Sequence, residues 1–224
     1  MKIATKITMV LFFTTLLFSQ ENKNPVALVR KVVKNVKHET IEKIVKDAKP
    51  GTPLLDGELV KTGVKSLALV KFLDGSLIRV RENSRLTIHG SKKGKKQIAN
   101  TIIHSGELNY DVNKQEEDEF KFTTPTGIAS IRGTSGSIEV GENETTFLLE
   151  TGQVELEATK GEKATGTLTP GKFAKIGQDG KIVFGDLTDK QKQKLKNAKL
   201  TKVKKLKIET ENGIYEIEFL DKEN

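Results

Sequence analysis

The chain has 224 residues, contains no cysteine or tryptophan, and carries a formal net charge of +8. The lack of cysteine excludes a disulfide scaffold, a thiol nucleophile, a lipid anchor on an N-terminal cysteine and a zinc site of the cysteine type. The lysine clusters lack the interleaved aromatic and arginine residues of nucleic-acid readers, so we expect no nucleic-acid partner. The positive charge instead fits a solvated surface, or contact with an anionic envelope polymer or an acidic protein face.

The first 20 residues are typical of a secretory signal peptide. Lys2 and Lys6 precede an apolar run over 7–18, and polar residues follow it. A membrane-spanning helix needs about 20 apolar residues, so this run is too short to cross a bilayer. We therefore expect export and removal of 1–20, no stable membrane span afterwards, and a location in the periplasm or outside the cell. The alternative is an uncleaved N-terminal anchor.

Residues 26–185 have the pattern of many short strands. β-Branched residues favour a strand over 26–37 and a weaker one over 40–47, although valines in the first segment also follow helical spacing. From residue 51 onward, alternating segments are separated by glycine, Asp-Gly, asparagine and proline. The clearest hairpin signal is Asp74-Gly75, and further turns are expected at 141–143 and 179–180.

This pattern predicts an all-β fold, specifically a β-sandwich or jelly-roll-like domain of many short strands over 26–185. A β-solenoid is the alternative, but the sequence shows no fixed repeat period. Residues 186–224 are expected to add one C-terminal α-helix and a terminal β-hairpin that pack on the main domain.

The helix is expected over 186–200. Thr188 and Gln191 have the spacing of a capping box, in which each residue satisfies a free backbone N–H near the other. Leu187, Leu195 and Ala198 lie near one helical face, and lysines fill the other. We expect the apolar face to cover a sheet edge or to join two sheets.

The terminal hairpin is expected to turn at Asn212-Gly213. This turn would pair Ile208 with Ile217, and it would place Glu209 opposite Glu216, which is unfavourable. It also predicts the pairs Thr210 with Tyr215, Leu206 with Phe219 and Lys207 with Glu218.

The segment 120–140 is the most informative part of the chain. Alternating residues from Phe120 predict a half-buried strand, and the pair Thr124-Pro125 then interrupts the ladder, because proline has no N–H to donate. An apolar strand follows over 128–131. Arg132-Gly133-Thr134 links it to another alternating strand over 137–140.

This order of elements resembles the signature of the FecR family, which has a Thr-Pro pair, a short apolar strand, Arg-Gly-Thr and another strand. Further segments follow the family pattern in order, so that the resemblance covers roughly residues 26 to 185. They lie at 51–57, 60–63, 68–80, 82–88, 106–108, 147–154 and 168–171.

The resemblance implies a β-rich extracytoplasmic domain without enzymatic activity. In the family proper, a transmembrane helix joins this domain to a cytoplasmic segment that controls a sigma factor, and the domain senses an outer-membrane transporter loaded with a ferric siderophore or ferric citrate. This chain shows neither that helix nor that segment. We therefore expect a stand-alone, secreted form that senses or binds an envelope protein or polymer, and iron-transport signalling is only weakly implied.

The resemblance also selects seven signature residues, whose roles we expect to be mainly structural. They are Asp74, Gly75, Thr124, Pro125, Arg132, Gly133 and Thr134. Two roles are open for Arg132: its planar guanidinium could hold neighbouring carbonyls or a carboxylate, or it could dock a partner.

The residues predict no catalytic site, no metal site and no cofactor. His38, His89 and His104 match no zinc motif, and Ser135 lacks the spacing, the strand-to-helix context and the base of a serine nucleophile. Plentiful carboxylates leave a secreted polysaccharide-active enzyme as the alternative function, although the chain is poor in the aromatic residues that stack on sugars. A purely structural surface protein is a third possibility, and the sequence leaves the oligomeric state open.

Overall fold

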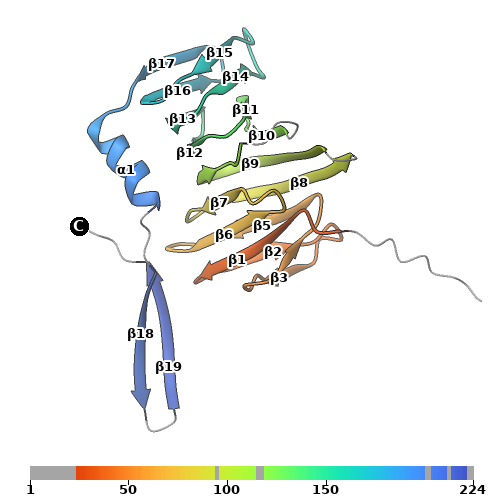
Figure 1. The fold of residues 1–224 in the computed structure, drawn as a ribbon, viewed down its shortest axis with the longest axis vertical. Coiled ribbons are helices and arrows are strands. Elements are labelled where there is room, and N and C mark those ends of the chain that lie inside the picture. The colour runs from red at the N-terminus through yellow and green to blue at the C-terminus, as the bar shows by residue number, and fades with distance from the viewer. Residues whose placement is uncertain (1–23, 94–95, 115–118, 200–202, 211–212, 221–224) are drawn as a thin grey trace, which may run out of the picture.

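The computed structural model describes residues 24–93, 96–114, 119–199, 203–210 and 213–220, so the predicted signal peptide lies outside the described residues. Most of these residues lie in strands, which stack into an elongated body (Figure 1). The strands of its first half are β1 (Ala27–Val33), β2 (Val36–Glu39), β3 (Val45–Asp47), β4 (Pro53–Leu54), β5 (Glu58–Thr62), β6 (Leu67–Phe72), β7 (Leu77–Val80), β8 (Arg85–Lys93) and β9 (Lys96–Asp111).

The second half of the body contains eight further strands. They are β10 (Glu119–Thr123), β11 (Gly127–Ile131), β12 (Ser135–Val140), β13 (Glu144–Thr151), β14 (Val154–Ala158), β15 (Thr165–Leu168), β16 (Lys172–Gly177) and β17 (Ile182–Asp186). The helix α1 (Asp189–Lys199) and the hairpin strands β18 (Val203–Thr210) and β19 (Gly213–Leu220) follow.

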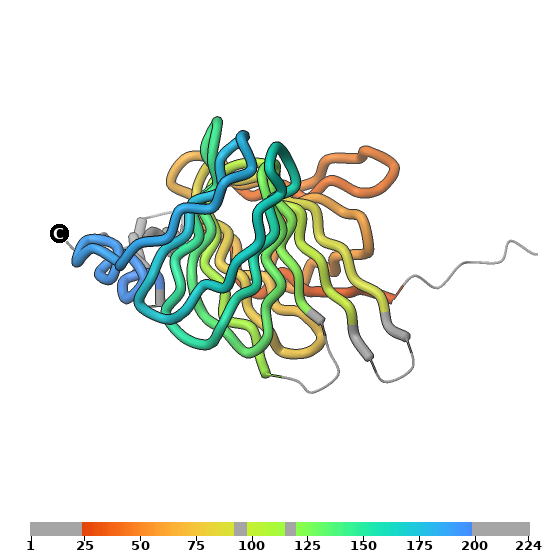
Figure 2. The backbone as a smooth tube through the Cα atoms, turned by 90° about the horizontal axis from the view of Figure 1, so that it is seen from above, coloured from red at the N-terminus to blue at the C-terminus, as the bar shows by residue number. Residues whose placement is uncertain are grey.

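The strands form two layers that share β9. Sheet A has the order β4-β1-β6-β7-β9-β12-β13-β16-β17, and sheet B has the order β3-β2-β5-β8-β9-β10-β11-β14-β15. All pairs are antiparallel except β9 with β10. Apart from β4 and β3 at the first edges, strands later in the chain lie farther along the same direction in both sheets, which makes the sandwich long (Figure 1). Figure 2 views this stack from the end that carries the last strands of the two sheets. The predicted all-β sandwich-like fold is confirmed.

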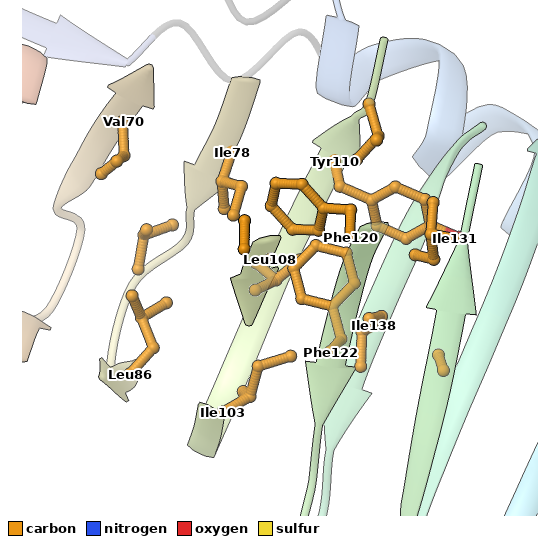
Figure 3. Close-up of a cluster of buried hydrophobic side chains, with 14 of the residues drawn as sticks. Val70, Ile78, Leu86, Ile103, Leu108, Tyr110, Phe120, Phe122, Ile131 and Ile138 are labelled. Carbon is orange, nitrogen blue, oxygen red and sulfur yellow. The ribbon is translucent and has the colours of Figure 1, made fainter. Parts of the chain in front are cut away.

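A single apolar core lies between the layers. Alternate residues of each strand point inward, as the two-residue period of a half-buried strand requires. Two aromatic contacts link the layers at mid-length: Phe72 meets Phe120 at a ring-centroid distance of 4.9 Å, and Tyr110 meets Phe122 at 5.1 Å. Phe120 and Phe122 are also 5.1 Å apart on β10 (Figure 3). These rings join sheet A to sheet B at the segment that carried the strongest sequence signal.

The predicted turns at 74–75, 141–143 and 179–180 are confirmed, since each joins an antiparallel pair. The single strand expected over 26–37 is wrong. Lys34 has a φ of 58°, a left-handed conformation that ends β1, and the chain then crosses from sheet A to β2 in sheet B. The alternation of valines looks the same on both sides of this corner, so it did not reveal the break.

The helix begins as predicted. The Thr188 N–H donates to Gln191 Oε1 at 2.9 Å, and the Gln191 N–H donates to Thr188 Oγ1 at 3.3 Å, which completes the capping box. The apolar face of α1 packs on the outer face of sheet A, where Leu187 and Leu195 contact Leu148 of β13. The helix thus covers a sheet face, and the expectation that it covers an edge or joins two sheets is wrong.

The terminal strands β18 and β19 form a separate two-stranded sheet (Figure 1). The predicted register is wrong by two residues, because Ile208 pairs with Tyr215 and Thr210 with Gly213. A shift of two keeps every residue on its face. It also replaces the unfavourable pair of glutamates by Lys207 opposite Glu216, and this gives the observed register a physical reason. The division into domains at 185 stays a prediction.

Candidate functional site

Five of the seven signature residues meet at one end of the strands of sheet A. Asp74 and Gly75 form the tight turn between β6 and β7, where Asp74 Oδ1 accepts the Ser76 N–H at 2.8 Å. The Ser76 hydroxyl donates to Asp74 Oδ2 at 2.6 Å and accepts the Asn113 N–H at 3.1 Å. The Asn113 amide in turn donates to the Asp74 carbonyl at 2.9 Å. The turn is therefore fastened to the segment that follows β9.

Arg132-Gly133-Thr134, the link from β11 to β12, lies on the other side of that segment. The Val112 N–H donates to the Thr134 carbonyl at 2.9 Å. Gly133 has a φ of 63°, and a Cβ atom there would lie 2.7 Å from the Cβ of Lys114. Both the backbone conformation and the space therefore require glycine. We call the surface formed by Asp74, Gly75, Asn113, Lys114 and 132–134 the signature rim.

The signature rim carries exposed side chains on a fixed backbone. Arg132, Asn113 and Lys114 are exposed, and Leu73, next to Asp74, is 60% exposed. The hydrogen bonds described above hold three segments that are distant in the sequence. The rim is thus a preorganised surface on which a guanidinium, an ammonium and an apolar side chain are exposed.

Thr124 and Pro125 lie at the opposite end of the strands. The strand β13 shows this separation. Near its start, the Thr145 hydroxyl donates to Thr124 Oγ1 at 3.1 Å. At its end, Thr151 contacts Ser135, which lies beside the signature rim. The Thr124 hydroxyl closes the turn into β11 through the Gly127 N–H and carbonyl. Thr124 is buried and Pro125 is exposed, so this pair shapes a turn and is not part of the rim.

Ser135 has the surroundings of a structural hydroxyl. It is buried and lies 2.7 Å from Thr151 Oγ1 and 3.3 Å from Glu150 Oε2. The three histidines hydrogen-bond elsewhere, since His38 contacts Glu58, His89 contacts Asp56 and His104 contacts Thr87. No cluster of three or more metal-ligating side chains occurs in the described part of the chain.

Gly136 provides space for a tyrosine of the core. A Cβ atom at Gly136 would collide with the Leu148 carbonyl of β13 and would lie 2.6 Å from the Tyr110 hydroxyl, which is buried. Burial raises the pKa of Tyr110, and the Thr134 hydroxyl lowers it by less. The two glycines of the Gly-Thr-Ser-Gly segment thus have separate structural reasons. Gly133 adopts a left-handed turn, and Gly136 lets the Leu148 carbonyl and Tyr110 approach closely.

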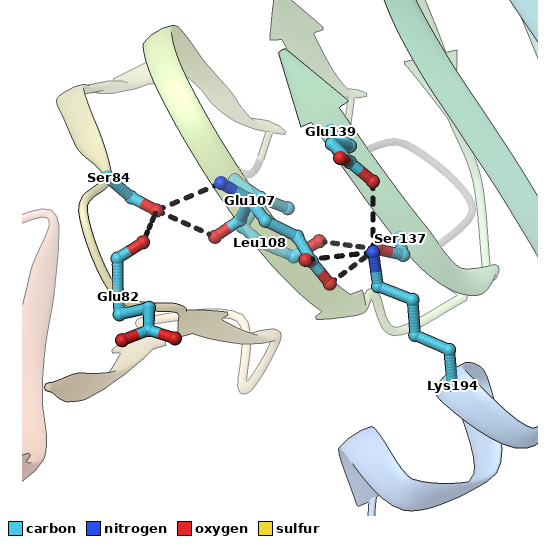
Figure 4. Close-up of polar contacts among 7 residues, drawn as sticks. All are labelled: Glu82, Ser84, Glu107, Leu108, Ser137, Glu139 and Lys194. Carbon is cyan, nitrogen blue, oxygen red and sulfur yellow. Dashed lines mark hydrogen bonds and ion pairs between the residues drawn. The ribbon is translucent and has the colours of Figure 1, made fainter. Parts of the chain in front are cut away.

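The outer face of sheet A holds a lysine between two carboxylates (Figure 4). Lys194 Nζ, from α1, lies 2.9 Å from Glu107 Oε2 and 2.9 Å from Glu139 Oε2. Burial by itself lowers the pKa of Lys194, but its hydrogen bonds and charge interactions with the two glutamates outweigh burial and raise it. Glu107 and Glu139 are register partners on β9 and β12, so Lys194 relieves a like-charge pair.

β9 crosses from sheet B to sheet A at Gly106, which has a φ of 91°. The Ser84 hydroxyl fastens this corner, because it accepts the Glu107 N–H at 2.9 Å and lies 3.0 Å from the Glu107 carbonyl (Figure 4). A Cβ atom at Gly106 would collide with Ser84. The corner thus sets where the two layers join and where Glu107 emerges beneath α1.

Comparison with known proteins identifies the region that contains these features. Residues 58–155 match the family model described as FecR protein. The predicted resemblance is confirmed over this range, which includes all seven signature residues. The helix α1 lies outside the matched FecR region, but its Lys194 binds two glutamates within it.

Solved structures resemble the fold of the chain. Two crystal structures of a "putative anti-sigma factor" from Parabacteroides distasonis ATCC 8503 superpose with a TM-score of 0.52 each, at 15% and 14% sequence identity. Each comparison covers 68% of this chain and 68% of that chain. At this identity the likeness concerns the fold alone. No curated protein matches the chain.

Three important residues of the FecR region were missed in the sequence. Asn113 joins the two halves of the signature rim, Glu107 anchors α1, and Ser84 fastens the corner of β9. The sequence marks a turn at 74–76 by its residue types. Nothing near Asn113 shows that its backbone N–H donates to the Ser76 hydroxyl, 37 residues away. In the described part of the chain, no helix has the length and apolar character needed to cross a bilayer.

Proposed function

We propose that the chain is a non-enzymatic sensing module of the cell envelope that binds a protein partner through the signature rim. The observation that carries the proposal is the assembly of Asp74, Gly75 and 132–134 of the FecR region into one surface with Arg132 exposed. Arginine is enriched at the centres of protein interfaces because its planar fork makes several directed hydrogen bonds. A protein partner is also what the family match and the description of the structural neighbours suggest.

The hydroxyl chemistry of the site supports binding over catalysis. Ser76, Ser135 and Thr124 use their hydroxyls to fasten turns and neighbouring strands. An enzyme acting on polysaccharides would need two carboxyl groups flanking the bond that is cleaved. At the rim, Asp74 instead uses both carboxylate oxygens within its own turn. Export to the envelope and the identity of the partner belong to the proposal.

Site-specific photocrosslinking in cells tests this function. A photoreactive phenylalanine analogue at Leu73 samples the signature rim, and the same analogue at Val64 is the matched control. Val64 is 67% exposed and lies beyond the opposite end of β6. We expect one discrete crosslinked protein from Leu73, lost in Arg132→Ala and retained in Lys190→Ala on α1. Equal crosslinking from Val64, or a product unaffected by Arg132→Ala, would contradict docking at the rim.

A further inference from the structure

The outer face of sheet B is the broad surface that the described elements leave open. The helix α1 packs on sheet A, on the other side of the body, so in the described part of the chain no helix covers the outer face of sheet B (Figure 1). Successive strand registers align Thr87, Ile102, Thr123 and Ile128 in one row across this face. A parallel row contains His89, Asn100, Lys121 and Ser130.

The centre of this face is flat, half-buried and mostly uncharged. Ile102, Thr123 and Ile128 occupy neighbouring strands, and all are half-buried although no other element lies over them. The Thr123 hydroxyl donates to Asn100 Oδ1 at 3.1 Å, so part of the polar capacity of the face is used within it. Such a surface loses little favourable hydration when another flat surface covers it.

The two ends of the face carry opposite charges. Lys61 and Arg85 are exposed register partners on β5 and β8, and Glu155 and Glu157 are exposed on β14. Four strand spacings separate β8 from β14, or about 19 Å at roughly 4.8 Å each. This exceeds the screening length of about 8 Å at physiological salt, so the two ends do not neutralise each other within one chain.

Other charged groups on the face are already engaged. Within the described residues, Lys37 pairs with Asp47, Glu39 with Lys43 and His89 with Asp56, while no ion pair joins Lys61, Arg85, Glu155 or Glu157 to a described residue. Lys121 lies on the central strand β10, between the two ends. The pKa of His104 is lowered, first by burial and then by its interactions with Arg85 and His89.

We propose that two copies of the chain associate through the outer faces of sheet B around a two-fold axis. In this arrangement the basic end of each copy lies on the acidic end of the other, and the centres meet, where Lys121 is the charged residue among threonine, isoleucine, asparagine and serine side chains. A surface with one basic end and one acidic end is complementary to itself under a two-fold rotation. Stacked sheets of this kind pack about 10 Å apart with their strands within about 30° of each other. The proposal does not rest on the function of the signature rim, which lies at the strand ends.

Charge reversal at each end, followed by mixing, tests the arrangement. The basic-reversed variant carries Lys61→Glu with Arg85→Glu, and the acid-reversed variant carries Glu155→Lys with Glu157→Lys. Sedimentation equilibrium at low salt should show a dimer for the wild-type chain and a dimer dissociation constant at least about 100-fold higher for each variant alone. An equimolar mixture of the two variants should restore the dimer, because both contacts between them are again attractive.

The control variant is Lys190→Glu with Lys196→Glu, on exposed positions of α1, which changes the net charge as much as the basic-reversed variant does. It should dimerise like the wild type. A wild-type chain that stays monomeric at low salt overturns the proposal. So does a mixture that stays monomeric although both variants keep the wild-type circular dichroism spectrum. If either variant fails to fold, the salt dependence of the wild-type chain decides: its dimer dissociation constant should rise at least about tenfold as salt increases. A dissociation constant that does not change with salt overturns the charge pairing.

Discussion

Replacing Gly106 by alanine tests whether the corner of β9 determines the joining of the two sheets. Gly106 and Gly51 share a φ of 91°, but their surroundings differ. A Cβ atom at Gly51 would meet nothing within 4 Å, whereas at Gly106 it would collide with the Cβ and Oγ of Ser84 and with its backbone. Gly51→Ala therefore isolates the backbone cost, and Gly106→Ala adds the loss of space.

The expected loss in the free energy of unfolding follows from this difference between the two sites. A left-handed conformation costs an alanine about 1–2 kcal/mol, and the reduced freedom of the unfolded chain offsets about 0.4–1 kcal/mol of it. Gly51→Ala should thus cost about 1 kcal/mol. At Gly106 the displaced Ser84 would also lose two hydrogen bonds to Glu107, about 1 kcal/mol each, and the crowding would add about 1 kcal/mol or more. We expect Gly106→Ala to cost about 3–5 kcal/mol.

Urea unfolding followed by circular dichroism measures both free energies of unfolding. The slope of each curve checks that the two variants unfold in the same cooperative transition as the wild type. Ser84→Ala should fall between them, because it removes the hydrogen bonds without adding an atom. If Gly106→Ala and Gly51→Ala cost the same within about 0.5 kcal/mol, the corner has no special role.

Three further predictions concern the rim, the helix and the hairpin. In thermal melts, Gly133→Val should lower the melting temperature strongly, since a β-branched residue cannot adopt a φ of 63° beside Lys114, while Ser135→Ala should shift it little; equal melting temperatures would contradict this. Because the folded-state pKa of Lys194 is raised, its stabilising effect should persist below its ordinary pKa of 10.5 and disappear as the pH rises through the folded-state value. The difference in melting temperature between wild type and Lys194→Gln should accordingly vanish at high pH, and a constant difference would refute the ion-pair role. With Lys207 opposite Glu216, Glu216→Lys should cost about 0.2–1 kcal/mol in urea melts, and the neutral or stabilising effect expected from the sequence register would argue against the observed pairing.

Local signals predicted much of the fold, since they depend on residues close in the sequence. The turn at Asp74-Gly75 follows from turn chemistry, and the capping box of α1 follows from the spacing of Thr188 and Gln191. Alternation likewise predicted the strands of the FecR region. These features need no knowledge of which strand lies beside which.

Features that depend on distant pairing could not be predicted in this way. The alternation of valines in 26–37 continues across the corner at Lys34, because a left-handed lysine leaves no mark in a hydrophobic pattern. The hairpin register was wrong because a shift of two preserves the faces, so only the cross-strand charges distinguish the two registers. The signature rim was recognised as a set of residues, but its two halves meet only because β9 runs between them.

The position of α1 follows from the chemistry of the sheet beneath it. β9 and β12 place Glu107 and Glu139 directly opposite each other on the outer face of sheet A, an arrangement that is unfavourable without a cation. A helix with only a narrow apolar face would bind a sheet weakly, but Lys194 is placed to neutralise both carboxylates at once. The helix lies outside the matched FecR region, but it neutralises two carboxylates on the surface of that region. The ion pairs of Lys194 and the apolar contacts of Leu187 and Leu195 with Leu148 hold α1 on sheet A, so the outer face of sheet B is left for the proposed second copy of the chain.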